Sequence, residues 1–524
     1  MSDLPPESPP EALPDDAPAD RPAPELAATI GGGWWLAFGL LYLAIRLPLI
    51  GYRGLDLDEA TSAHLAHRGL ADVWAQVRAN DIHPPLFYLL LQPLRKLTAD
   101  ERVLRLLPLA AGWGVCWAAA RIALLIAGRR PALYTLLLCL AAPFAVQYSL
   151  YLRPSVLGAC WAAFLTALAV AWWRARLQGD PEPHPRWWFI AAATLGLYTF
   201  YLVGAVLLAV ALVGIAVLWR RWADLRRWVI ACAIPGLLFL PWLPTFFAQR
   251  AGWAARVPTV NARGEPITTA LPPNLQFELA LQALVPRFPE FIDPRWALLV
   301  LIAAALASSI YARHRGPVQG RLMTGLIFLV LLVTAALWAA FETSPYPLQI
   351  RYLFLVLPLC WVLIGTGLAA TGRFIGPALL AVVLWLAVIG TIEWTLQRSE
   401  DYRAAGRYLA ARADPAAPVF VVAHFSAIGL AHYWPRGEHQ MVPIKQFDAN
   451  LPGPMGKVNA ALGKQPPEVW VALARDQGGR WRGLHRGGRG LVRLLTGRYG
   501  QPEVMRYQGV TLFRWDVYGD PAAP

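Results

Sequence analysis

Acidic side chains gather in the segment that follows the first long apolar stretch of the chain. This segment reads Gly-Tyr-Arg-Gly-Leu-Asp-Leu-Asp-Glu-Ala and carries Asp56, Asp58 and Glu59. Carboxylates beside a membrane are costly to bury, so they often mark function. A carboxylate there can take a proton from an attacking hydroxyl. We therefore expect Asp58 to be catalytic and Glu59 to be catalytic or to orient an acceptor. The alternative is that the acids only cap a helix beginning near Glu59, the role we assign to Asp56.

Histidines provide a second set of candidates in the same loop. His83 precedes a double proline that fixes the backbone and aims the imidazole at the acidic segment. It can bind phosphate, ligate a metal or orient an acid, and the alternative is a structural role. His64 and His67 stand three residues apart, a spacing that can suit a metal, but a solvated interfacial helix face is the preferred interpretation.

Two arginines stand at the boundaries of later apolar stretches. Arg153 follows Gln-Tyr-Ser-Leu-Tyr-Leu, and Arg351 lies in Gln-Ile-Arg-Tyr. The planar guanidinium matches phosphate oxygens in a bidentate manner, so the two side chains together can clamp a phosphate. Each arginine alone can merely extend towards the membrane surface. The tyrosines near these positions are candidates for substrate contact, although most aromatic residues are expected in the interfacial belt: Tyr148, Tyr151, Tyr201 and Tyr352.

The elements that must position these side chains are membrane helices. Of the 524 residues, 57% are apolar and only 15% are charged, whereas a soluble protein carries roughly 25% charge. A helix needs about 20 apolar residues to cross a bilayer. We count eleven candidate spans, near residues 33–50, 103–127, 131–148, 152–174, 187–200, 202–219, 228–248, 296–312, 321–341, 351–370 and 373–395.

Arginine clusters predict the sidedness of these spans. Cytoplasmic loops carry an excess of Lys and Arg, and with an inside N-terminus five arginine clusters fall on the cytoplasmic side. The segment 84–97 would reverse this if it crossed fully, so we expect a juxtamembrane helix at the outer face. This choice leaves Arg95, Lys96, Arg102 and Arg105 outside, against the rule. The loops 51–97 and 250–295 are then also outside, on the face that carries the candidate site.

The two ends of the chain differ from its centre. Residues 1–30 are rich in Pro, Ala, Asp and Glu, which predicts a disordered cytoplasmic tail. Residues 31–398 form the predicted transmembrane domain. Residues 399–524 have a soluble pattern that predicts a small outer α/β domain, with helices near 400–412 and 488–498 and strands near 418–423, 467–472 and 509–516. The net charge of +14 sits in clusters between apolar runs, which suits membrane topology and not nucleic acid.

The order and spacing of these motifs resemble the GT-C superfamily of membrane glycosyltransferases. Asp58-Glu59, the His-Pro-Pro motif at His83 and Arg351-Tyr352-Leu353 are similar to the bacterial branch of protein mannosyltransferase-like, rhizobial lipopolysaccharide-sugar and aminoarabinose transferases. The resemblance covers about residues 33–420. It implies a GT-C fold and inverting transfer from a polyprenyl-phosphate sugar to a glycan, lipid or protein acceptor at the outer face of a bacterial inner membrane. Asp58 would be the base, and Glu59 would help to hold the acceptor.

The mechanism that follows is a hypothesis in which Arg351, Arg153 and His83 hold the donor phosphate. His83 stands where aminoarabinose transferases carry a Lys. Relatives often have an acid in the turn that here reads Arg153-Pro154, and the motif Tyr-Thr-His-Tyr appears as Tyr-Thr-Phe-Tyr ending at Tyr201. The missing acid argues against a two-acid metal site, although a divalent cation stays possible. The loop containing Asn274, Gln276 and Glu278 is expected to close over the site.

Two other classes of protein compete with the enzyme interpretation. A multi-pass lipid or small-molecule transporter also needs many spans and polar groups in the membrane, but transporters tend to show inverted repeats and sites at the midplane. A non-catalytic membrane assembly protein would not require Asp58 and Arg351 to converge. Geometry discriminates among the three, because the enzyme requires Asp58, His83, Arg153 and Arg351 to face one cavity.

Overall fold

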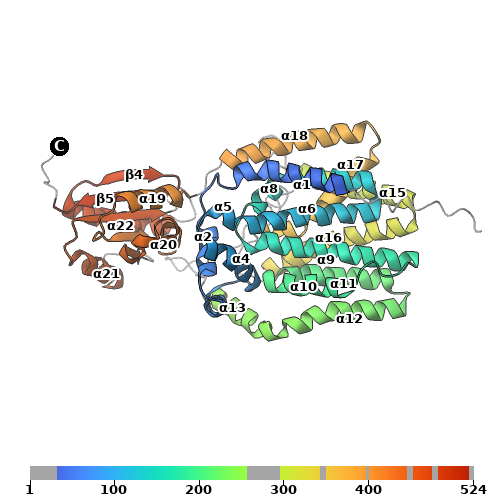
Figure 1. Ribbon diagram of the computed structural model, residues 1–524, viewed down its shortest axis with the longest axis horizontal. Helices are drawn as coiled ribbons and strands as arrows, with labels where there is room; N and C mark the ends of the chain where they lie inside the picture. The colour runs from blue at the N-terminus through green and yellow to red at the C-terminus, as the bar shows by residue number, and fades with distance from the viewer. Residues whose placement is uncertain are drawn as a thin grey trace, which may run out of the picture.

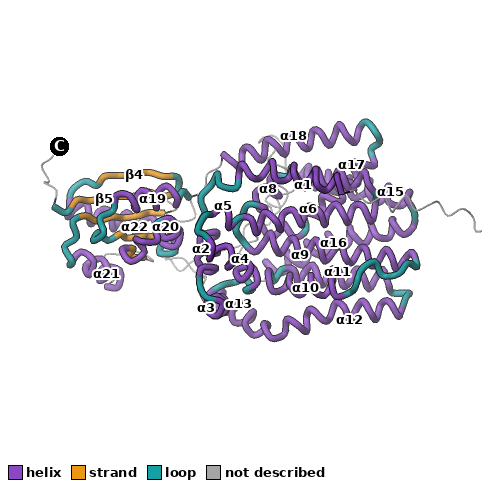
Figure 2. Tube along the Cα trace, in the orientation of Figure 1, coloured by secondary structure: helices purple, strands orange, loops and turns teal. Residues whose placement is uncertain are grey.

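A helical bundle and a small sheet domain lie end to end along the long axis of the molecule (Figure 1). The computed structural model describes residues 32–256, 295–342, 350–396, 400–444, 452–474 and 482–518. All strands of this described part lie in the C-terminal domain, and helices make up the rest (Figure 2). The predicted tail, most of the loop 250–295 with Asn274, Gln276 and Glu278, and most of the turn before Arg351 lie outside the described residues.

Apolar helices run side by side along the bundle and occupy the eleven predicted spans (Figure 1). The central helices α6 and α9 are mostly buried, whereas α1, α12 and α18 expose apolar side chains on the outside, as lipid-facing helices do. The helices of the bundle are α1 (Gly32–Arg46), α5 (Glu101–Leu104), α6 (Leu106–Ala127), α7 (Arg129–Ala141), α8 (Pro143–Ser149), α9 (Pro154–Gln178), α10 (Trp187–Thr199), α11 (Val203–Leu218), α12 (Trp222–Phe239), α13 (Leu243–Arg256), α15 (Arg295–Arg315), α16 (Pro317–Glu342), α17 (Leu357–Ala370) and α18 (Ile375–Leu396). Short 3₁₀ turns precede or join several of them, namely η2 (Leu47–Leu49), η3 (Leu240–Trp242) and η4 (Ile350–Leu355).

Not every span is a single straight helix. Among the described residues, six helices are long and apolar enough to cross a membrane alone, and α7 and α8 together make a seventh that bends by 62°. Pro143 begins α8, and its missing N–H explains the break. Arg46 of α1 donates to the Leu140 carbonyl at 3.1 Å and to the Ser149 hydroxyl at 2.8 Å, so polar groups near the break have a partner inside the bundle.

Three short helices cover the end of the bundle that faces the sheet domain. They are α2 (Leu57–His67), α3 (Leu70–Asn80) and α4 (Leu86–Leu97), and α2 lies between the bundle and the sheet domain (Figure 1). The α4 helix has 12 residues, which is too short to cross a bilayer. It buries Phe87, Tyr88 and Leu91 on one face. A juxtamembrane helix was predicted here, and α4 has the length and the amphipathic pattern of one.

The C-terminal domain contains a five-stranded sheet with the order β2-β1-β3-β5-β4. The parallel strands are β1, β2 and β3, and β5 and β4 continue the sheet in antiparallel pairing. Their bounds are β1 (Val419–Val422), β2 (Met441–Ile444), β3 (Glu468–Ala474), β4 (Glu503–Tyr507) and β5 (Val510–Asp516). The predictions for β1, β3 and β5 are confirmed, whereas the short edge strands β2 and β4 were not predicted.

Helices cover both faces of this sheet. Val419 and Val421 of β1 face α19 (Tyr402–Arg412) and α20 (Ser426–Tyr433), while Phe420 and Val422 face α21 (Pro452–Leu462) and α22 (Arg482–Tyr499). A short 3₁₀ turn, η5 (Pro435–Gln440), connects α20 to β2. Because both faces of β1 are covered by helices, all of its residues are buried, and its sequence is continuously apolar. The fold class is therefore the predicted one, a polytopic helical membrane protein with a small C-terminal α/β domain.

Candidate active site

The start of α2 fixes the acidic segment. The Asp56 carboxylate accepts a hydrogen bond from the Glu59 amide at 2.8 Å, and the Glu59 carboxylate accepts one from the Asp56 amide at 3.3 Å. This reciprocal pair is a capping box, so the predicted role of Asp56 as a helix cap is confirmed. Asp58 then lies in the first turn of α2, on a backbone that the cap holds in place.

Glu59 forms a buried ion pair with Arg105, the residue that joins α5 and α6. Arg105 Nη2 lies 2.7 Å from Glu59 Oε2, and Arg105 Nε lies 3.0 Å from Oε1. Oε1 also accepts from the Leu152 amide at 3.0 Å, and Oε2 from the Asp56 amide. A carboxylate has about four lone-pair positions, and all of them are used here. The predicted contact between Glu59 and an acceptor would therefore have to displace one of these partners.

Asp58 forms an ion pair with Arg351, which lies in η4. Arg351 Nη1 is 2.6 Å from Asp58 Oδ2, although the two residues are 293 positions apart. The Tyr151 hydroxyl approaches the same oxygen at 3.5 Å. The Asp58 side chain is 38% exposed, compared with 4% for Glu59. Of these two carboxylates, Asp58 is therefore the one that a substrate can reach.

Arg153 and His83 lie beside this ion pair. Arg153 Nη1 donates to the Asp58 carbonyl at 3.2 Å, and Arg153 Nη2 lies 3.3 Å from His83 Nε2. Burial, together with the charges of Arg153 and Arg351, holds the pKa of His83 well below its usual value. The imidazole is thus neutral, and its Nε2 accepts the hydrogen bond from Arg153. His83 therefore holds the Arg153 guanidinium through this hydrogen bond and carries no charge of its own.

Aromatic rings surround these groups. Tyr148 packs against Tyr151 in a T-shaped arrangement with centroids 5.7 Å apart, and Tyr352 stacks on Phe200 at 5.8 Å. Tyr201 faces a different environment, because its hydroxyl donates to Gln249 and accepts from Trp242. The structure therefore brings Tyr148, Tyr151 and Tyr352 towards the Asp58–Arg351 pair and places the Tyr201 hydroxyl in a contact between α13 and η3.

The donor set for a cation is poor in this region. No group of three or more His, Cys, Asp or Glu side chains arranged to hold a metal occurs in the described part of the chain. Burial and the neighbouring acids Glu59 and Asp58 raise the pKa of Asp56 to about 7. A carboxyl group that is partly protonated at neutral pH is a weak ligand. Glu59 and Asp58 are also paired with arginines, so both carboxylates already have a cationic partner.

The C-terminal domain contacts the loop that leads into α2. The Tyr433 hydroxyl of α20 accepts a hydrogen bond from the Leu55 amide at 2.6 Å. Arg403 of α19 pairs with Glu101 at 2.6 Å and donates to the Gly51 carbonyl at 3.1 Å. The loop before Asp58 is therefore held from one side by Arg105 and from the other by the sheet domain.

Sequence reasoning missed Arg105, Arg403 and Tyr433. Arg105 had one signal, because it was a basic residue on the face where the positive-inside rule disfavours one. Its pairing with Glu59 gives a structural reason for this exception. Arg403 lies in residues 400–405, a segment that also resembles the family, but its contacts and those of Tyr433 depend on how the two domains dock.

Solved structures share this fold. ArnT from Cupriavidus metallidurans in the apo state matches with a TM-score of 0.59 at 15% identity, over 94% of this chain and 99% of ArnT. ArnT bound to undecaprenyl phosphate matches with a TM-score of 0.57 at 14% identity, over 94% and 99%. The archaeal oligosaccharyltransferase AglB from Archaeoglobus fulgidus, in complex with an inhibitory peptide and a dolichol-phosphate, matches with a TM-score of 0.53 at 10% identity, over 93% and 74%. No protein-family model and no curated protein matches the sequence. The likeness concerns the fold, which is the predicted GT-C fold.

Proposed function

We propose that this protein transfers a sugar from a polyprenyl-phosphate donor to an acceptor hydroxyl, with inversion at the anomeric carbon. The observation that carries this proposal is the Asp58–Arg351 pair, in which a reachable carboxylate meets a guanidinium from a distant span. A second guanidinium, that of Arg153, lies against the Asp58 backbone. A proton acceptor beside two phosphate-binding cations is what this reaction requires.

The chemistry follows from these positions. Arg351 and Arg153 bind the donor phosphate and stabilise the charge that develops on it as it leaves. Asp58 accepts the proton of the acceptor hydroxyl, and the hydroxyl oxygen forms a bond to the anomeric carbon. The bond between that carbon and the phosphate oxygen breaks on the opposite face, which inverts the configuration. When Arg351 binds the phosphate, its hold on Asp58 weakens, and the carboxylate becomes a better base.

The neighbouring side chains position these groups. His83 is neutral and accepts from Arg153, so it fixes the direction of the guanidinium fork. Glu59 acts through Arg105 on the start of α2, and its filled lone pairs favour this role over contact with the acceptor. The rings of Tyr148, Tyr151 and Tyr352 pack around the Asp58–Arg351 pair, and this supports the proposal that they contact the sugar.

The donor class is supported by the ligands of the fold's neighbours. ArnT is solved with undecaprenyl phosphate, and AglB with dolichol-phosphate and a peptide. For this chain we propose a polyprenyl phosphate as the carrier and a glycan, lipid or protein as the acceptor. By the positive-inside rule, the arginine clusters support a site and a sheet domain on the outer face of the cytoplasmic membrane, and the family resemblance supports a bacterial membrane. Asp58 lies in α2, at the end of the bundle that faces the sheet domain (Figure 1), whereas a transporter site is expected near the middle of the bundle.

Transfer from labelled undecaprenyl-phosphate sugars tests the proposal. Membranes containing the protein are incubated with a panel of hexose, pentose and aminopentose donors, and the release of labelled sugar into glycolipid, glycan and protein is followed. We expect Asp58→Asn to lower kcat by roughly 10²–10⁴-fold, the usual contribution of a positioned base. Asp72→Asn removes an exposed acid from α3 and is the matched control. Full activity of Asp58→Asn would exclude Asp58 as the base.

Arg351→Lys separates donor binding from proton transfer. Lysine keeps the charge but loses the bidentate fork, so we expect a raised KM for the donor and a smaller fall in kcat than in Asp58→Asn. An unchanged KM for the donor would remove Arg351 from the phosphate site.

A further inference from the structure

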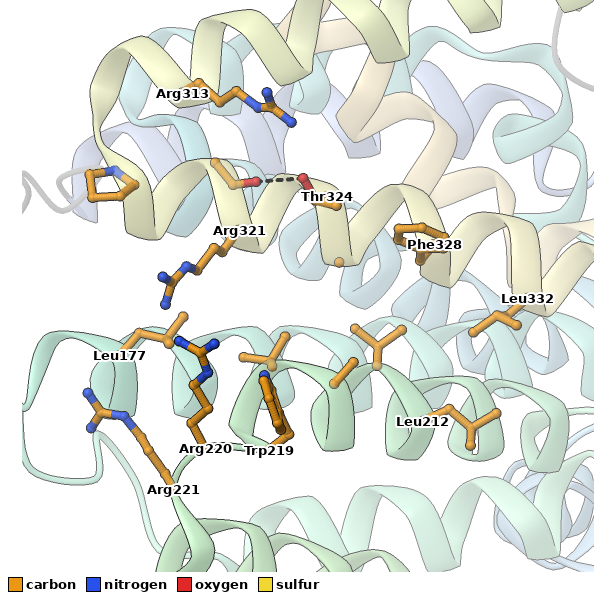
Figure 3. Close-up of a pocket in the computed structure, with 16 residues that line it drawn as sticks. Leu177, Leu212, Trp219, Arg220, Arg221, Arg313, Arg321, Thr324, Phe328 and Leu332 are labelled. Carbon is orange, nitrogen blue, oxygen red and sulfur yellow. Dashed lines mark hydrogen bonds between the residues drawn. The ribbon is translucent and has the colours of Figure 1, made fainter.

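A second group of cations lies at the end of the bundle opposite the sheet domain. Arg220, Arg221, Arg313 and Arg321 line a cavity of about 850 Å³ between α11 and α16, which we call the arginine groove (Figure 3). The groove runs along the bundle from these arginines towards Leu212 and Leu332. It is separate from Asp58, which belongs to α2 at the end of the bundle facing the sheet domain (Figure 1).

Among the described residues, no acid balances the charge of these arginines. In the part of the chain that the structure describes, none of the four forms an ion pair with a carboxylate, and all four are exposed. Asp224 is close in sequence but is paired with Arg176 at 3.0 Å. The Arg220 guanidinium lies over the Trp219 ring at 4.9 Å, which holds it in place without neutralising it. Four cations grouped in this way attract an anion.

The remainder of the groove is apolar. Leu212 and Phe328 are 46% and 56% exposed, and they come from the two helices that wall the cavity, α11 and α16, with Leu332 further along (Figure 3). The arginines are confined to one end, and the apolar side chains continue towards the centre of the bundle. A ligand that matches both parts has an anionic head and a hydrocarbon tail that lies along the helices.

The turn between α15 and α16 brings Arg313 against α16. Gly316 adopts a φ of +141°, which favours glycine. A Cβ at Gly320 would lie 2.9 Å from Arg313 Cγ, so glycine leaves the space that Arg313 occupies. The Thr324 hydroxyl donates to the Gly320 carbonyl at 2.9 Å, within the helix that forms one wall of the groove (Figure 3). The position of Arg313 thus depends on small residues at two points of this turn.

We propose that the arginine groove binds an anionic phospholipid, with its phosphate among the four arginines and an acyl chain along Leu212, Phe328 and Leu332. Guanidinium groups bind phosphate oxygens through paired hydrogen bonds. Basic pockets between membrane helices suit such headgroups on the cytoplasmic side, where the positive-inside rule places this end of the bundle. The alternative is that the arginines set topology alone and make no defined lipid contact.

Native mass spectrometry of the full chain in a non-ionic detergent tests this proposal. The purified protein is titrated with phosphatidylglycerol, with phosphatidylcholine and with glycerol 3-phosphate, which carries the phosphate without acyl chains. We expect retention of phosphatidylglycerol, at least tenfold weaker retention of phosphatidylcholine and no retention of glycerol 3-phosphate, given the roughly fivefold contribution of each arginine near a membrane surface. Equal retention of the two lipids would overturn the proposal, and binding of glycerol 3-phosphate would exclude the acyl-chain contact.

Two double variants distinguish lipid binding in the arginine groove from a general effect of positive surface charge. Arg313→Gln/Arg321→Gln removes two groove cations, and Arg226→Gln/Arg227→Gln removes two exposed cations of α12 outside it. We expect the first to weaken phosphatidylglycerol binding by roughly tenfold or more and the second to leave it within about twofold. Equal losses in both would show that only topological charge is involved. If the first variant does not fold, Arg220→Gln/Arg221→Gln carries the same test with the same control.

Discussion

A test of the buried ion pair between Glu59 and Arg105 can show whether Glu59 positions helix α2 or binds the acceptor. Both side chains are only 4% exposed, and the two guanidinium contacts are 2.7 and 3.0 Å long. Removing one partner of a buried ion pair costs about 3–5 kcal/mol. In Glu59→Gln, Arg105 keeps the carbonyls of Ile50, Arg53 and Gly54 as acceptors. We therefore expect the lower end of this range, about 3 kcal/mol.

Hydrogen exchange measures this cost locally, because the pair joins the start of α2 to the start of α6. A loss of about 3 kcal/mol makes opening of α2 roughly 10²-fold more frequent, at 1.36 kcal/mol for each factor of ten. We expect α2 amides of Glu59→Gln to exchange faster by this factor. The matched control is Glu182→Gln, because Glu182 pairs with Arg186 at 2.9 Å on the surface. A pair of that kind contributes at most about 1 kcal/mol.

A double variant completes the test. Glu59→Gln/Arg105→Gln removes both charges, so neither charge is left buried alone. We therefore expect the α2 amides of this double variant to exchange more slowly than the sum of the two single-variant effects predicts. The coupling expected for such neighbours is about 0.5–3 kcal/mol. The reasoning is refuted if Glu59→Gln leaves α2 exchange unchanged and raises only the KM for the acceptor. That result would return Glu59 to the acceptor-binding role that the family resemblance implies.

Two further predictions concern the contact between the domains. Tyr433→Phe leaves the buried Leu55 amide without its acceptor, so we expect a loss of about 1–3 kcal/mol, seen as a lower thermal midpoint and a reduced kcat with an unchanged donor KM. Burial and the nearby charge of Arg95 lower the pKa of His432 to about 4, from an unperturbed 6.5. The unfolded chain therefore binds more protons between pH 6.5 and 4, and stability falls as the pH falls through this window. In His432→Gln we expect the thermal midpoint to depend less on pH between 6.5 and 4. An unchanged pH dependence of the midpoint would contradict the role given to His432.

Hydropathy predicted most of the bundle, whereas the sidedness drawn from charge placement stays a prediction. Apolar runs of about 20 residues are a strong signal because every backbone polar group must be bonded internally in a membrane. The same reasoning identified 84–97 as a segment too short to span, and α4 has 12 residues. Edge strands β2 and β4 escaped prediction because each is short, at 4 and 5 residues, and only partly buried.

The sequence allowed most residues of the candidate site to be selected, but it did not show which of them form ion pairs with one another. The acidic cluster, His83 and both arginines could be selected because polar residues at the ends of apolar spans are conspicuous. Which carboxylate meets which arginine depends on the packing of spans far apart in sequence, as with Asp58 and Arg351. Periodicity assigns no partner to Glu59, so its pairing with Arg105 was not foreseen. Tyr201 was grouped with the site by its motif, and a local contact with Gln249 and Trp242 engages its hydroxyl instead.

One helix start connects the sheet domain to the acidic segment. Glu101 and Arg105 lie one turn apart, and the Arg105 amide donates to the Glu101 carbonyl at 3.0 Å. Glu101 holds Arg403 of the sheet domain, whereas Arg105 holds Glu59 directly behind Asp58. A shift of the sheet domain therefore moves the residue that fixes the start of α2. Because a displacement of about 1 Å at a reacting group can cost about 10²-fold in rate, we predict that undocking of the C-terminal domain lowers activity as well as stability.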